Sequence, residues 1–192
     1  MIDIHCHILP GVDDGPVTLD ESLLMAKEAV IEGIHTIIAT PHHRNNKFEN
    51  SKEEILRNVS EFNSVLKEEN IPLTILPGQE TRIFGELIND YNNGEILTLT
   101  NTDYLFIEFP TSSVPRYAER LLYEIQTVGL TPIIVHPERN KEIIENPILL
   151  YDFVKNGALT QVTAASIAGY FGKAIKKFSH QLIQSNLVHF VS

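Results

Sequence analysis

Five short apolar runs of the chain each lead into side chains that can bind a metal ion. These side chains are His5 and His7, His42, Glu80, Glu108 and His136. The carboxyl ends of parallel strands lie on one rim of a sheet or barrel, so ligands far apart in sequence converge there. Imidazoles combined with carboxylates suit manganese, iron or zinc. Because the donors exceed the needs of one ion, we expect a centre of two or three divalent ions.

The first of these runs carries a His-x-His pair. His5 and His7 stand two residues apart on a predicted strand, so both side chains point to one face and can share an ion, while Cys6 points to the other face. A loop from Pro10 to Gly15 follows and contains two aspartates. We select Asp14 as a further ligand, although aspartate is also favoured in turns.

The middle runs offer an imidazole and two carboxylates. His42 is nearer the strand end than His43, so His42 is the preferred ligand, with His43 as the alternative ligand or a surface residue. Glu80 follows a Pro-Gly-Gln turn. Glu108 lies inside an apolar run, where a carboxylate is costly to bury unless it is paired or coordinated. A buried ion pair is therefore the alternative for Glu108.

Arg139 follows the His136 run and is a candidate phosphate ligand. A guanidinium group binds phosphate oxygens through two parallel hydrogen bonds. A salt bridge on the following helix is the alternative. The remaining histidines, His35, His180 and His189, are read as structural.

The arrangement of apolar runs predicts an α/β fold. Seven runs alternate with segments of helical period, as in a parallel sheet or barrel; they span residues 2–7, 35–40, 73–76, 104–109, 131–136, 159–163 and 187–191. Capping boxes are expected at Thr18–Glu21 and Ser51–Glu54. Helix ends are expected at Gly33, Gly129 and Gly157, and a helix break at Gly169 and Gly172. The pattern indicates a TIM-like barrel of seven units, with residues 43–50 as a loop beside the site.

Composition limits the possible functions. The 192 residues fit one domain, and the net charge of -10 disfavours a nucleic-acid surface. The single cysteine, Cys6, fits a reducing compartment. Neither a signal peptide nor an apolar run of roughly 20 residues is present. We therefore expect a cytoplasmic protein.

The motifs together resemble a known family. They are IDIHCHILPGVDDG (2–15), ATPHH (39–43), LPGQE (76–80), IEFP (107–110), VPRYA (114–118) and VHPERN (135–140). The chain is similar to the bacterial metal-dependent tyrosine phosphatases of the polymerase and histidinol phosphatase (PHP) superfamily. The resemblance implies a distorted seven-stranded barrel, three metal ions that are usually manganese, and dephosphorylation of the tyrosine-rich tail of a kinase that controls capsule or exopolysaccharide synthesis.

The resemblance also assigns residues. It makes metal ligands of His5, His7, Asp14, His42, Glu80, Glu108 and His136, and a phosphate-binding residue of Arg139. The family's Ser-Asp-Ala-His run, which supplies two further ligands ahead of the closing helix, would begin where this chain ends at Val191 and Ser192. We therefore expect residues 1–192 to be a single PHP-type domain that is truncated at its carboxyl end.

The predicted reaction is hydrolysis of a phosphomonoester by water that the ions activate. Arg139 and His42 are the candidate catalytic residues, since a histidine or water must protonate the leaving phenolate. Cysteine-dependent phosphatase chemistry is excluded, because it needs an arginine six residues after the cysteine and Val12 stands there. The alternatives are a histidinol phosphatase-type enzyme, an amidohydrolase and a catalytically impaired protein that binds the kinase tail.

Overall fold

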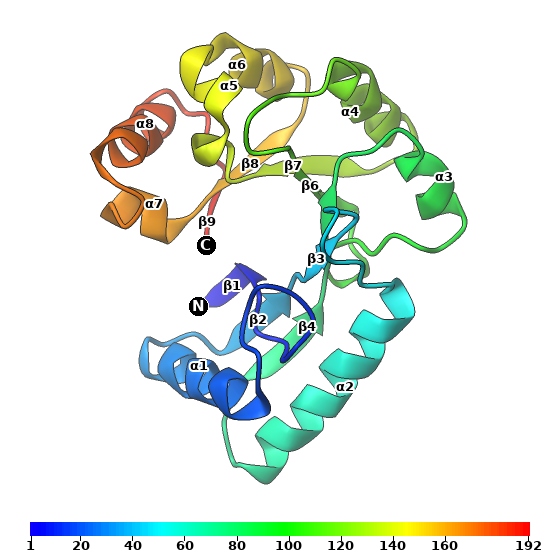
Figure 1. Ribbon diagram of the computed structural model, residues 1–192, viewed down its shortest axis with the longest axis vertical. Helices are drawn as coiled ribbons and strands as arrows, with labels where there is room; N and C mark the ends of the chain where they lie inside the picture. The colour runs from blue at the N-terminus through cyan, green and yellow to red at the C-terminus, as the bar shows by residue number, and fades with distance from the viewer. The chain divides into compact units, whose positions relative to one another are not determined.

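The computed structural model describes all residues 1–192, which divide into two compact units (Figure 1). Unit 1 comprises residues 1–81 and 89–102, and unit 2 comprises residues 82–88 and 103–192. Each unit alternates parallel strands with helices. None of the helices combines the length and apolar character that crossing a membrane requires.

Unit 1 is built on a three-stranded parallel sheet. Strand β2 (Thr36–Ala39) lies between β1 (Ile2–Cys6) and β4 (Thr74–Pro77). The register of β1 on β2 shifts between Asp3 and Cys6. Bulges of this kind re-aim side chains beside active sites, and this one includes His5.

Two short strands follow β2 and β4 along the chain. Strand β3 (His42–His43) pairs in parallel with β5 (Glu80–Arg82), and His42 stands opposite Glu80. Pro41 separates β2 from β3 because proline has no N–H for the ladder. Gly78 lies between β4 and β5, where a Cβ would stand 2.7 Å from the Ile38 side chain. Close packing therefore requires glycine at that position.

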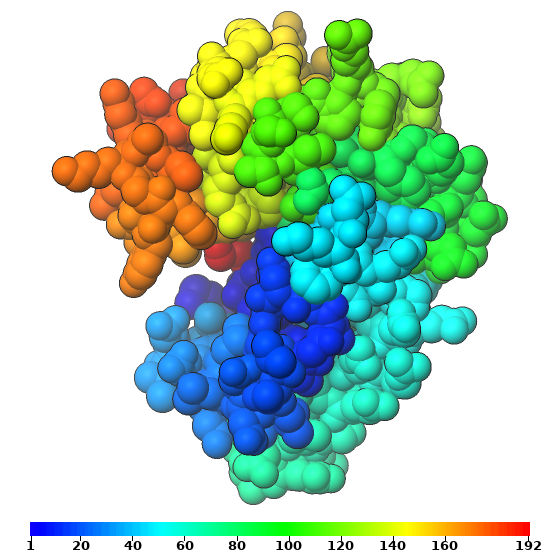
Figure 2. All heavy atoms as spheres, in the orientation of Figure 1, coloured from blue at the N-terminus to red at the C-terminus, as the bar shows by residue number.

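Two helices pack on the sheet of unit 1. Both predicted capping boxes are present, at the start of α1 (Leu19–Ile31) and of α2 (Lys52–Glu68). Apolar residues of these helices, among them Ala26 and Phe62, join Ile37 and Ile75 in one buried core. In Figure 2 the surface coloured from blue to turquoise belongs to unit 1 and includes atoms of α1 and α2. Helix α3 (Leu87–Asn92) and the 3-10 turn η1 (Leu99–Asn101) complete the connections.

Unit 2 contains four parallel strands that pair in chain order. The strands are β6 (Tyr104–Glu108), β7 (Thr131–Val135), β8 (Leu159–Val162) and β9 (Phe190–Val191). The helices are α4 (Ala118–Thr127), α5 (Lys141–Glu145), α6 (Ile148–Lys155), α7 (Ala164–Ala168) and α8 (Lys173–Gln184), with the 3-10 turn η2 (Pro137–Arg139) after β7.

The structure confirms most of the predicted elements. All seven apolar runs contain a strand, and Gly33, Gly129 and Gly157 follow helix ends with positive φ values of 83°, 87° and 98°. The break at Gly169 and Gly172 separates α7 from α8. The α/β class with parallel strands is therefore confirmed, whereas the closed seven-stranded barrel stays a prediction.

Candidate metal centre

In unit 1, three imidazoles surround one carboxylate oxygen. Oε2 of Glu80 lies 3.3 Å from Nε2 of His5, 3.1 Å from Nε2 of His7 and 3.1 Å from Nδ1 of His42. The Glu80 side chain is fully buried. His5 lies on β1 and His7 just after it, while His42 and Glu80 begin β3 and β5, a few residues beyond the carboxyl ends of β2 and β4. The sequence predicts that these residues meet.

The spacing of these donors suits a divalent cation. Ligand atoms about 2.1 Å from one ion stand roughly 3.0 Å apart at octahedral angles and roughly 3.4 Å apart at tetrahedral angles. The measured separations of 3.1–3.3 Å lie in that range. His5, His7 and Glu80 therefore form one group of donors that could hold an ion, with ligand atoms all within 4.8 Å of one another.

A second group of donors adjoins the first. Oδ1 of Asp14 lies 3.5 Å from Nε2 of His42 and 3.8 Å from Nδ1 of His7. The Asp14 side chain is 64% exposed, so it approaches the cluster from the solvent side. Ligand atoms of His7, Asp14 and His42 all lie within 4.8 Å of one another. Unit 1 thus holds donors for more than one ion.

Asp13 has the buried side chain of the aspartate pair, and it was not among the ligands predicted from sequence. Its Oδ2 lies 2.6 Å from Nδ1 of His7 and accepts a hydrogen bond of 3.1 Å from the backbone N–H of His42. Its Oδ1 accepts from the N–H of Gly15. A carboxylate bonded to one imidazole nitrogen fixes the ring and directs the other nitrogen toward a metal.

The charges of this cluster shift two pKa values. Burial lowers the pKa of His7, but hydrogen bonds to Asp13 and Glu80 and the charges of both carboxylates outweigh it and raise the pKa to about 10. Burial raises the pKa of Asp13, yet the hydrogen bond and charge of His7 hold it below its usual value. Without metal, a proton on His7 thus balances the carboxylates, and a cation would replace that proton.

His43 points to a different environment from His42. Its side chain is buried, and neither ring nitrogen has a hydrogen-bond partner. Burial, followed by the charge of Arg44, lowers its pKa. The reading of His43 as a surface residue is therefore wrong, and His42 is the member of the pair that faces Glu80.

In unit 2, Glu108 ends β6 and forms the ion pair considered as its alternative role. Nη2 of Arg82 donates to Oε1 of Glu108 at 3.0 Å, and the Glu108 side chain is 8% exposed. A carboxylate has two oxygens, so pairing through Oε1 does not exclude coordination. Arg82 lies on β5, and the sequence does not predict it as the partner of Glu108.

His136 and Arg139 lie in the turn after β7. His136 has φ 36° and ψ 49°, a left-handed conformation. Residues other than glycine rarely adopt it, and those that do are often found at functional sites. Its N–H donates to the Gln161 carbonyl at 2.7 Å. Arg139 forms no ion pair, so the alternative of a helix salt bridge gains no support; its guanidinium carbon instead lies 5.2 Å from the centre of the Phe171 ring.

The remaining histidines lie outside these groups. His35 precedes β2 and is exposed, His180 lies on α8, and Nδ1 of His189 accepts a hydrogen bond of 3.1 Å from the N–H of Thr160. His189 stands just before β9 rather than inside it.

Comparison with known proteins places the whole chain in one family. The family described as capsular polysaccharide synthesis, CpsB/CapC, matches residues 1–192. The chain belongs to the CpsB/CapC family. It is 52% identical over 192 residues to the tyrosine-protein phosphatase YwqE of Bacillus subtilis, covering all of this chain and 76% of YwqE. It is 32% identical over 197 residues to the tyrosine-protein phosphatase CpsB of Streptococcus pneumoniae, covering 81% of that protein.

A solved structure extends the likeness to three dimensions. It comes from crystal structures of YwqE from Bacillus subtilis and CpsB from Streptococcus pneumoniae, both metal-dependent tyrosine phosphatases. The match has a TM-score of 0.97 at 52% identity and covers all of this chain and 78% of the solved chain. The α/β fold of this CpsB/CapC chain is therefore that of a metal-dependent enzyme family.

In this CpsB/CapC chain, buried amides support the donors of unit 1. Nδ2 of Asn50 donates to the backbone carbonyls of His42 at 2.8 Å and of Val12 at 3.1 Å. Nε2 of Gln79 donates to the Asn50 carbonyl at 2.8 Å. These bonds link the loop after β1, the first residue of β3 and the residue before Glu80. The sequence signal for Asn50 and Gln79 is weak. Gln79 stands next to the predicted ligand Glu80, but polar residues are common in loops in any case.

Proposed function

We propose that this protein is a metal-dependent protein-tyrosine phosphatase that acts in capsular or exopolysaccharide synthesis. The observation that carries the proposal is the convergence of His5, His7 and His42 on Oε2 of Glu80. The donors have the spacing of a cation site, and the chain is 52% identical to a tyrosine-protein phosphatase over its whole length. The substrate is a phosphotyrosine protein, and a bacterial tyrosine kinase is the partner we propose.

Seven residues would hold two or three divalent ions, with manganese as the proposed metal. They are His5, His7, Asp14, His42, Glu80, Glu108 and His136. When bound, the ions polarise the phosphate ester and lower the pKa of water. We further propose that the parallel strands of both units belong to one seven-stranded barrel, which would give these residues a common rim.

The protein residues have separate tasks in this reaction. Arg139 orients the substrate by donating to phosphate oxygens. His42 turns Nδ1 to Glu80 and Nε2 to Asp14, so both nitrogens face carboxylates and the ligand role is favoured over proton donation. Water then protonates the leaving phenolate, whose pKa near 10 makes a strong acid unnecessary.

Turnover of a phosphotyrosine peptide by metal-depleted protein, with and without added manganese, tests the proposal. We expect activity only with metal, and a fall of roughly 100-fold or more in kcat/KM for His136→Ala. His35→Ala is the matched control, because His35 is exposed and lies outside the donor groups. Undiminished turnover by His136→Ala would refute the ligand assignment.

Two further measurements separate the alternative functions. Faster turnover of histidinol phosphate than of the peptide would favour a small-molecule phosphatase. Peptide binding with less than one metal ion per chain and no turnover would favour a non-catalytic binding protein.

A further inference from the structure

Phosphate recognition alone cannot select tyrosine. Phosphotyrosine and phosphoserine present the same phosphate group, so Arg139 and bound ions would contact both alike. An apolar or aromatic contact to the phenyl ring is needed to favour an aryl ester. The surroundings of Arg139 in unit 2 provide such a group.

Phe171 is the aromatic side chain that contacts Arg139. The guanidinium carbon stands 5.2 Å from the centre of the Phe171 ring, within the range of a cation–π interaction. Phe171 remains 46% exposed, whereas Phe109, Phe153 and Phe178 of the same unit are buried. One part of the ring thus covers the cation while another part is open to a ligand.

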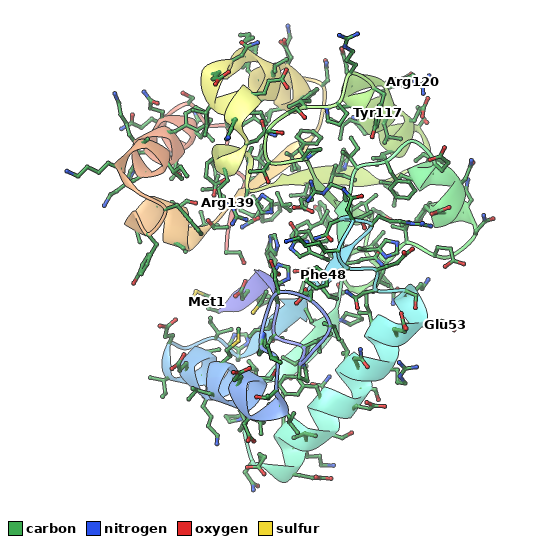
Figure 3. All side chains as sticks on the ribbon, viewed as in Figure 1. Met1, Phe48, Glu53, Tyr117, Arg120 and Arg139 are labelled. Atoms are coloured by element: carbon green, nitrogen blue, oxygen red, sulfur yellow. The ribbon has the colours of Figure 1, made fainter.

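The backbone around Phe171 is built to present this ring. Phe171 stands between α7 and α8, next to Gly172 and two residues after Gly169, whose φ values are 94° and 101°. Residues with a side chain rarely adopt these φ values, so the two glycines allow the sharp turn. Figure 2 shows α7 and α8 as the orange surface of unit 2, and Figure 3 labels Arg139 beside these helices.

A buried carboxylate joins the Arg139 turn to the segment that carries Phe171. Oε1 of Glu138 accepts hydrogen bonds from the backbone N–H of Thr163 at 3.1 Å, from its hydroxyl at 3.0 Å and from the hydroxyl of Ser166 at 2.6 Å. Glu138 is fully buried. Because Glu138 precedes Arg139 and Thr163 caps α7, these bonds fix the two segments that bring Arg139 and Phe171 together.

We propose that Phe171 is a specificity residue that contacts the phenyl ring of the substrate while Arg139 holds its phosphate. The inference rests on the proposed phosphatase function. A second aromatic residue, Phe48 in unit 1, stacks on His42 with ring centres 6.2 Å apart (Figure 3). Its contact is with a candidate metal ligand, so we assign ring recognition to Phe171.

Binding of two phosphonates that differ only in their organic group tests the proposal. Phenylphosphonate and methylphosphonate are titrated calorimetrically into the manganese-loaded protein and its Phe171→Leu variant. We expect the Kd of phenylphosphonate to rise about 3- to 10-fold, the size of one lost aromatic contact, and that of methylphosphonate to change less than about twofold. Phe171→Tyr should restore the wild-type values, and Tyr170→Leu, at an 86% exposed neighbour, is the matched control.

Each outcome decides between explanations. Equal weakening of both ligands would mean that Phe171 only positions Arg139, and unchanged binding would mean that it has no role; either result overturns the proposal. Kinetics on phosphotyrosine and phosphoserine peptides of one sequence should show the same selectivity, mainly in KM. Failure of the wild-type protein to hydrolyse either peptide would refute the phosphatase function, while the calorimetric comparison would still report on Phe171.

Discussion

Asp13 and His7 form a partly buried carboxylate–imidazole pair, with Oδ2 of Asp13 2.6 Å from Nδ1 of His7. The same carboxylate holds the backbone N–H of His42. Asp13 therefore fixes the orientation of one candidate ligand and the position of another.

Replacing Asp13 should weaken metal binding. We expect Asp13→Ala to raise the Kd for manganese about 10- to 100-fold, because the imidazole of His7 loses the partner that orients it. Asp13→Asn keeps an acceptor oxygen and should show a smaller rise. Calorimetric titration of the metal measures both, with Asp20→Ala on the exposed first turn of α1 as control. Wild-type affinity in Asp13→Ala would contradict the positioning role.

Metal-free protein should lose stability toward alkaline pH. The pKa of His7 is raised from 6.5 to about 10 in the folded chain, so its contribution is complete below pH 6.5 and disappears as the pH rises to about 10. We expect the free energy of unfolding in EDTA to fall by on the order of a few kcal/mol across that interval. Urea unfolding at a series of pH values measures it. An equally steep fall in Asp13→Ala would show that this pair is not the cause.

At acid pH, Asp13 changes the stability in the opposite direction to His7. Its pKa is held below the ordinary 3.8, mainly by the hydrogen bond and charge of His7 working against burial. The stabilisation by ionised Asp13 is therefore complete above pH 3.8 and is lost as the pH falls through the lower folded value.

The strand ends could be predicted from sequence, but the partners of the ligands could not. Apolar runs and parallel topology place His5, His42 and Glu80 near one another, since strand order alone brings carboxyl ends together. The choice between Asp13 and Asp14 depends on the path of a six-residue loop, which hydrophobic periodicity does not describe. Likewise, Arg82 pairs with Glu108 across strands, and no spacing along the chain encodes that contact.

Gly15 should be intolerant of a larger residue. A Cβ there would overlap the carbonyl oxygen of His7 and stand 3.1 Å from Oδ1 of Asp13. We expect Gly15→Ala to cost roughly 1–3 kcal/mol of stability, the usual size for an overpacked site. We also expect it to weaken manganese binding, because the added methyl group would displace His7 or Asp13. Thermal unfolding with and without metal measures both effects. Gly85→Ala is the control, since its Cβ would meet nothing within 4 Å; a similar loss in both variants would contradict the explanation.

Cys6 should be chemically inert in the folded protein. Burial, followed by the charges of Asp3 and Asp13, raises its pKa to about 12, so only about one thiol in ten thousand is ionised at pH 8. We expect a thiol reagent such as iodoacetamide to leave activity unchanged and to label Cys6 only after unfolding. Mass spectrometry follows the labelling, and Cys6→Ser should keep its turnover. Rapid labelling with loss of activity would show that the thiol takes part in the reaction.

Anomalous X-ray scattering from crystals soaked in manganese would locate the ions directly. We expect a peak about 2.0–2.4 Å from Nε2 of His5, Nε2 of His7 and an oxygen of Glu80, with loss of that peak in Glu80→Gln. A manganese peak elsewhere, with His5, His7 and Glu80 uncoordinated while the protein hydrolyses phosphotyrosine, would contradict it.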